Sequence, residues 1–331
     1  MRRRDFITML GGAVTAWPLS AQGQQQPGGR RIPIVGFIGL ASASVDGQAI
    51  VPFRQTLSEL GYIEGRTIVI EERNAEGNVE RARALIAELA ALPVDVFLSP
   101  GPAMSRALVR LTKIPVVAIA LPATASEPEL FSSLAHPGGT LTGFSALGEE
   151  MSAKRIEMLK ELIPGLKTLG VMHNATDPSF TWGEQTMADA RKSGLEPVKF
   201  GLSSLSTATV VEHFKTLGEM RGTAMIVLRD FLTAALTADI CKAGIDARIA
   251  VVGEFSEYAR AGALLSYGAD QADLLRRAAG YVDRVLKGEK AVDLPIQLPT
   301  KFELALNLKT ARTIGIDIPP TIQVRAEQVI E

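Results

Sequence analysis

The chain has 331 residues, of which 47% are apolar, and its 35 basic and 36 acidic side chains leave a formal charge of -1. This composition allows a large buried core and excludes a disordered or fibrous protein. Because Lys and Arg are not in excess, nothing marks a surface that neutralises phosphates, and we expect no nucleic-acid partner.

The first 30 residues have the pattern of an export signal followed by a flexible leader. Three arginines at positions 2–4 precede an apolar stretch at residues 6–19, small residues follow at 20–21, and residues 22–30 are rich in Gln, Gly and Pro. The apolar stretch falls short of the ~20 residues that span a bilayer, so we expect the signal to be removed and the mature protein to be periplasmic. The arginines fit a twin-arginine signal, and the general secretory route stays open. The single cysteine, Cys241, predicts neither a disulfide framework nor a lipid anchor.

From residue 32 onward, β-branched runs alternate with amphipathic helical stretches. This alternation predicts parallel sheets that are covered by helices on both faces. In the first half of the chain we expect strands at 32–40, 67–71, 94–98 and 115–120, and helices at about 50–60, 85–92 and 103–111. Residues 121–142 contain several Pro and Gly without a sustained period, so they should interrupt the pattern.

The pattern resumes with a helix at about 149–163. We then expect strands at 166–173, 196–200, 224–228, 249–252 and 264–267, and helices at about 183–193, 208–217, 237–243 and 271–286. The fold class is therefore α/β, with two doubly wound parallel-sheet lobes joined by a hinge of crossing segments. We expect an N-terminal lobe of residues 31–146 plus about 264–294, and a C-terminal lobe of about 147–263 plus 295–331. The carboxyl ends of the strands in both lobes should face one cleft.

Three stretches carry a resemblance to a known family. They are Phe-Arg-Gln at 53–55 with Leu-Gly-Tyr-Ile-Glu-Gly-Arg at 60–66, His-Pro-Gly-Gly-Thr-Leu-Thr-Gly at 136–143, and Leu-Pro-Thr-Lys-Phe-Glu-Leu at 298–304 with Asn-Leu-Lys-Thr-Ala at 307–311. From about residue 32 to the end, the chain resembles the ABC-transporter substrate-binding proteins related to tryptophan and tyrosine binders, which have the type I periplasmic-binding fold. It departs from them after the fourth strand, where Leu-Pro-Ala-Thr at 121–124 replaces the Gly-Asp-Pro run that is common in the family.

The resemblance implies a periplasmic receptor that works with a membrane permease and an ATPase. Its solute would be a small carboxylate-bearing molecule, an amino acid or an aromatic acid. We expect a monomer without cofactor or metal that closes around this solute. A periplasmic sensory protein that docks to a receptor would have the same sequence features, and this alternative stays open.

In the N-terminal lobe, the best candidate ligand-binding residues are Ser99, Gly101 and Ala103. They lie between a strand and the start of a helix, where unpaired backbone N–H groups can bind an anion. Ser42 and Ser44 follow the first strand at the equivalent position. An ordinary strand-to-helix turn would have the same composition.

In the C-terminal lobe, the candidates are Asn174, Trp182, Asp230 and Glu254, which follow predicted strands. Trp182 could stack on a ring, and Asp230 could accept a solute ammonium while the neighbouring Arg229 orients it or binds a carboxylate. A core tryptophan and a surface salt bridge are the structural alternatives.

Other classes of function lack the residues that they require. The only histidines are His136, His173 and His213, and with Cys241 they show neither metal-ligand nor nucleophile-elbow spacing, so we expect no catalytic residues and no enzyme. The run Gly-Phe-Ile-Gly-Leu at 36–40 lacks the spacing of a dinucleotide-binding loop. Because only the predicted export signal precedes the first strand, we expect no DNA-binding helix-turn-helix.

Overall fold

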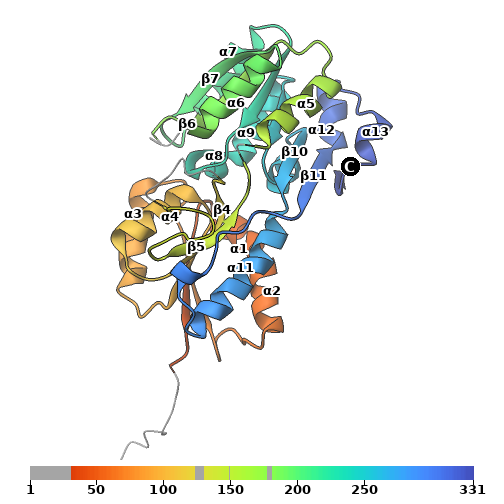
Figure 1. Ribbon diagram of the computed structural model, residues 1–331. Helices are drawn as coiled ribbons and strands as arrows, with labels where there is room; N and C mark the ends of the chain where they lie inside the picture. The colour runs from red at the N-terminus through yellow and green to blue at the C-terminus, as the bar shows by residue number, and fades with distance from the viewer. Residues whose placement is uncertain (1–30, 124–129, 149, 177–180) are drawn as a thin grey trace, which may run out of the picture. The chain divides into compact units, whose positions relative to one another are not determined.

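The computed structural model describes residues 31–123, 130–148, 150–176 and 181–331. The predicted export signal and leader therefore lie outside the described residues. Residues Ile32 to Glu331 form one unit that contains two sheets, as Figure 1 shows.

The first sheet is fully parallel, with the order β2-β1-β3-β4-β5. Its strands are short and mostly buried, as expected where helices cover both faces, except that the edge strand β2 is only partly buried. They are β1 (Ile34–Gly39), β2 (Val69–Asn74), β3 (Val96–Ser99), β4 (Val116–Leu121) and β5 (Leu141–Ser145). The helices of this region are α1 (Ala43–Ala49), α2 (Val51–Glu59), α3 (Val79–Ala90), α4 (Pro102–Leu111) and, from much later in the chain, α11 (Gln271–Leu286), which is followed by the short 3-10 helix η1 (Ala291–Asp293).

Successive residues of these strands belong to different cores. Val35 and Phe37 of β1 pack in a cluster with α2 and α11, whereas Ile38 packs in a second cluster with α3 and α4. This alternation follows from the period of two along a strand. Each face of the sheet is thus covered by its own helices.

The second sheet has the order β12-β11-β10-β9-β8-β6-β7 and is parallel except where β11 runs antiparallel to β10. Its strands are β6 (Thr168–Asn174), β7 (Glu196–Leu202), β8 (Thr223–Val227), β9 (Ala250–Gly253), β10 (Leu265–Ala269), β11 (Phe302–Asn307) and β12 (Gln328–Ile330). The helices are α5 (Ser152–Leu162), α6 (Thr181–Lys192), α7 (Thr207–Gly218), α8 (Phe231–Ala235), α9 (Thr237–Asp246), α10 (Ser256–Ala261), α12 (Leu308–Ile314) and α13 (Pro320–Gln323). The predicted fold class, two α/β lobes built on parallel sheets, is confirmed.

The structure differs from the sequence-based expectation at two places. The expected N-terminal lobe resumes at about residue 264, but β10 is hydrogen-bonded between β9 and β11 in the second sheet, and only α11 returns to the first. The segment 121–142, expected to interrupt the pattern, ends in β5, which pairs with β4. We propose lobe limits at residues 31–146 plus 270–294 and residues 147–269 plus 295–331.

Candidate functional site

The turn between β3 and α4 contains a buried glycine that borders open space. Gly101 is buried, yet a β-carbon added to it would meet no atom within 4 Å outside its chain neighbours. It is the N-cap of α4, and its carbonyl accepts the first helical hydrogen bond, from the backbone N–H of Ser105. The N–H groups of the first helical turn have no partner inside the helix and point toward its N-terminal end. The arrangement is suited to a small anion.

The serines of this turn have a structural role. The hydroxyls of Ser99 and Ser105 are 2.8 Å apart and both donate to the carbonyl of Gly101, at 3.2 and 2.9 Å. Ser99 is fully buried, and Ala103 packs partly buried against the core of the first lobe. The serines thus hold the carbonyl of the turn in place, and a contact of Ser99 with the solute stays a prediction.

The first strand ends beside this turn. Because Phe37 is paired with Leu98, the segments that follow the two strands leave the sheet side by side. Ser42 is exposed at the N-cap of α1, and Ser44 lies inside α1, with its side chain outside the described part of the chain. Asp46 of α1, which no sequence pattern indicates, is buried and accepts hydrogen bonds from the backbone N–H of Ala41 at 2.8 Å and from Asn74 at 2.9 Å.

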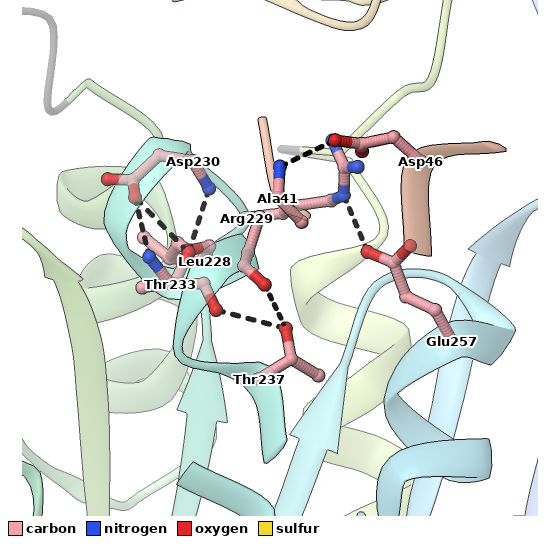
Figure 2. A network of polar contacts seen from close by, with 9 residues as sticks. Ala41, Asp46, Leu228, Arg229, Asp230, Thr233, Thr237 and Glu257 are labelled. Carbon is pink, nitrogen blue, oxygen red and sulfur yellow. Dashed lines mark hydrogen bonds and ion pairs between the residues drawn. The ribbon is translucent and has the colours of Figure 1, made fainter. Parts of the chain in front are cut away.

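In the second lobe, the predicted residues Asn174 and Asp230 organise the backbone at strand ends. The Asn174 side-chain oxygen accepts from the N–H and the hydroxyl of Thr176, at 2.8 and 2.7 Å. Asp230 is the N-cap of α8: its Oδ1 accepts from the N–H groups of Leu232 and Thr233, and the Thr233 hydroxyl accepts from the N–H of Asp230. Figure 2 shows this capping box. Trp182 lies in α6, and its side chain is outside the described residues.

Arg229, directly before Asp230, points toward the first lobe. Its Nε donates to Glu257 of α10 at 2.7 Å, and its guanidinium lies over the ring of Phe255 at 5.4 Å. Burial would lower the pKa of Arg229, but the negative charges of Glu257 and, more weakly, Asp46 outweigh this and raise it, so the side chain is a permanent cation. In the view of Figure 2 the Arg229 guanidinium lies between the carboxylates of Glu257 and Asp46.

Glu254, the last predicted site residue, is buried beside a buried arginine. Its Oε1 lies 3.8 Å from Nη1 of Arg155 and has no hydrogen-bond partner. Burial raises the pKa of Glu254 and lowers that of Arg155. Arg155 donates to the carbonyls of Gly148 and Tyr267, at 3.1 and 2.7 Å, and so ties α5 to a segment between the sheets and to β10.

The two lobes contact each other beside these charged groups. Phe231 and Ala234 of α8 belong to a core cluster of the first lobe. A β-carbon on Gly77, which has a positive φ of 70°, would lie 2.5 Å from Leu205 and 2.6 Å from Ala235. Segments that follow β2, β7 and β8 therefore lie against one another where the two lobes meet.

Two other kinds of site are absent from the residues that the structure describes. These residues contain no group of three or more His, Cys, Asp or Glu side chains that could hold a metal ion. Among them there is likewise no helix with the length and apolar character to cross a membrane.

Comparison with known proteins gives a consistent result. The sequence model of the family described as ABC transporter substrate binding protein matches residues 43–330. A tyrosine-binding protein from Clostridioides difficile is 24% identical over 269 residues, which cover 80% of this chain and 75% of that protein.

Two solved structures, each 25% identical, cover 90% of this chain and 100% of their own. One is a conserved domain protein from Vibrio cholerae, with a TM-score of 0.81. The other is an ABC domain from Streptococcus pneumoniae in complex with L-Trp, with a TM-score of 0.76. Because the family match covers most of the described fold, the chain belongs to the ABC transporter substrate-binding protein family.

Proposed function

We propose that this protein captures a small carboxylate-bearing solute, an amino acid or an aromatic acid, between its two lobes outside the cytoplasm. It then delivers the solute to the permease and ATPase of an ABC uptake transporter. The observation that carries this proposal is the buried Gly101 at the N-terminus of α4, because the space next to it is open and the backbone N–H groups there suit a carboxylate. The tyrosine-binding relative and the L-Trp complex support an amino acid as the solute.

The role requires binding and release without a chemical step. The solute contacts both lobes and stabilises the closed state by its higher affinity for that state. The transporter then recognises the closed protein. We propose that the protein acts as a monomer, because one chain supplies both walls of the site.

A ligand screen tests the proposal directly. The mature protein is melted in the presence of amino acids, aromatic acids, branched-chain acids, sugars and nucleobases, and the hits are measured by calorimetry. A carboxylate-bearing solute should raise the melting temperature, because a ligand that binds only the native state stabilises it by mass action. Stabilisation by a sugar or nucleobase alone would refute the proposed solute class.

Two further measurements test the mechanism and the location. Small-angle scattering should give the mass of a monomer and a smaller radius of gyration with saturating solute than without it. Fractionation of the native cells should place the protein outside the cytoplasm, with the amino-terminal segment removed. Unchanged dimensions at saturation would refute closure, and a cytoplasmic protein with an intact amino terminus would refute export.

A further inference from the structure

Two buried side chains of opposite charge face each other from different lobes without forming an ion pair. Asp46, in α1, is 5% exposed, and the side chain of Arg229, after β8, is 9% exposed. Among the described residues, the only carboxylate within 4 Å of the Arg229 guanidinium is that of Glu257. Asp46 and Arg229 are nevertheless close enough for each to shift the pKa of the other. Figure 2 shows the two side chains next to each other, Asp46 from the first lobe and Arg229 from the second.

Both side chains have hydrogen-bonding atoms that remain available. Both bonds to Asp46 end on Oδ2, and no described residue donates to its Oδ1. Arg229 uses Nε for Glu257, and no described residue accepts from its two terminal nitrogens. Neither Oδ1 nor these nitrogens belong to the buried atoms that are sealed from solvent without a partner. Each of them is thus an atom that a polar group of the solute could bind.

The charges of this cluster do not cancel. Arg229 and Glu257 neutralise each other as an ion pair, which leaves Asp46 as a surplus negative charge. The pKa of Asp46 is raised, mainly by burial and to a lesser extent by the negative charge of Glu257. The hydrogen bonds from Asn74 and Ala41 and the positive charge of Arg229 lower this pKa, but they only partly offset the effect of burial. A cation placed against Oδ1 would relieve this unfavourable burial of a carboxylate.

The Gly101 turn lies near the same cluster. Ala41, whose N–H binds Asp46, follows β1, and Gly101 follows the neighbouring β3. An α-amino acid carries its ammonium and its carboxylate on the same carbon. It could therefore reach Asp46 with one group while the other lies between the N-terminus of α4 and Arg229.

We infer that Asp46 accepts the ammonium group of the solute and that Arg229 binds the carboxylate of the same solute from the opposite lobe. This inference rests on the proposed function and deepens it. The first lobe would hold the ammonium through Asp46 and the carboxylate through the backbone at Gly101. The second lobe would reach only the carboxylate, so that only a correctly oriented amino acid connects the two lobes.

The test uses pairs of ligands that differ only in the amino group. L-Tryptophan is compared with indole-3-propionate, and L-tyrosine with 3-(4-hydroxyphenyl)propionate, by calorimetry on the mature protein. Asp46→Asn keeps an oxygen that accepts the N–H of Ala41 but removes the charge. It should weaken amino-acid binding about 10- to 100-fold and leave the affinity for the acids without the amino group within about twofold.

Two variants separate this effect from general damage. Asp283→Asn is the matched control, because Asp283 is 8% exposed, accepts from Tyr62 at 3.0 Å, and lies in α11 rather than in the cluster around Arg229. It should change no affinity. Arg229→Lys keeps the positive charge but loses the planar fork. It should weaken both members of each ligand pair by a similar factor, and melting curves establish that each variant is folded.

The outcomes distinguish this inference from the proposed function. Equal loss for both ligands of a pair with Asp46→Asn, or no loss for either, overturns the role of Asp46. If the wild-type protein binds only the acids without the amino group, the inference fails while the capture of carboxylates stands. If the wild-type protein binds none of the carboxylates, the proposed function itself fails. An unfolded Asp46→Asn variant would contradict the claim that its hydrogen bonds survive the change.

Discussion

Replacing Gly101 by alanine introduces a single methyl group into the space that we assign to the solute. The backbone at Gly101 is extended, with φ 169° and ψ -177°, so alanine can adopt it. The new β-carbon would meet no heavy atom of the protein within 4 Å apart from the chain neighbours. The variant should therefore fold. Its free energy of unfolding should change by no more than about 1 kcal/mol, because the loss of chain entropy in the unfolded state and the poorer N-cap act in opposite directions.

The effect on binding should be much larger than the effect on stability. A methyl group at this position keeps a carboxylate away from the N–H groups of α4, and a hydrogen bond to a charged group contributes about 1.5–3 kcal/mol. Affinity should fall about 10- to 150-fold. Calorimetry with the best solute from the screen measures this change, and thermal melting measures stability on the same samples.

Gly280→Ala is the matched control for this experiment. Gly280 lies within α11, and a β-carbon there also meets no atom within 4 Å. The control should gain up to about 1 kcal/mol of stability from helix propensity and keep the wild-type affinity. If Gly101→Ala binds as tightly as the wild type, no solute group approaches this turn. If it fails to fold, the space beside Gly101 is not open.

Three further predictions concern the N-cap of α8, the buried pair of Arg155 and Glu254, and the buried thiol of Cys241. Asp230→Ala should lower the free energy of unfolding by about 0.5–2 kcal/mol, because the N-cap of α8 is lost, and Asp230→Asn should keep most of the wild-type stability. If the alanine variant binds solute more weakly and the asparagine variant does not, Asp230 acts through the cap rather than by touching the solute. Arg155→Met should lower the free energy of unfolding by about 3–5 kcal/mol, because Glu254 loses its counter-charge. This loss should grow as the pH rises above the usual glutamate pKa of 4.5, since burial raises the pKa of Glu254 and the folded state then binds its proton more tightly than the unfolded state; denaturant titrations that show no pH dependence would contradict it. Cys241 is buried and burial raises its pKa to about 12, so a thiol reagent should label it only after unfolding. Rapid labelling of the native protein would show that the core of the second lobe opens.

The sequence predicted the two-lobe fold because each strand and helix carries its own periodic signal. It failed at β5, because this strand of five residues follows a segment rich in Pro and Gly. Gly143 shows why that segment contains glycine: with φ 142°, a β-carbon there would lie 1.9 Å from the carbonyl oxygen of Ala118 on β4. A segment rich in Pro and Gly, which predicts a loop, therefore ends in a strand that needs glycine because β5 and β4 approach each other closely. β10 was assigned to the wrong sheet because a single short strand gives no signal for its partner.

The candidate site was harder to predict because its chemistry depends on contacts between distant residues. Asp230 is expected to touch the solute, which stays a prediction, and the structure shows that it also caps a helix. The spacing of Asp230 and Thr233, followed by apolar residues, is close to a capping box and could have indicated this role. No local pattern could have identified Asp46 or the pairing of Arg155 with Glu254, because in each case the relevant partner comes from a different part of the chain. No sequence pattern distinguishes Glu257 from other residues that follow a strand, so its ion pair with Arg229 could not be predicted.

The positions of these groups also determine how a solute can drive closure. Shifting a two-state equilibrium from 1:99 to 99:1 requires about 5.5 kcal/mol of differential affinity. A single charged hydrogen bond across the interface supplies about 1.5–3 kcal/mol, so one contact to Arg229 cannot complete the shift. Phe231 and Ala234 pack against the core of the first lobe in this structure, and if opening breaks this contact, it favours the closed state and reduces what the solute must add. In the closure that we propose, two or three such contacts would supply the remaining differential affinity, provided that the solute touches both lobes at once.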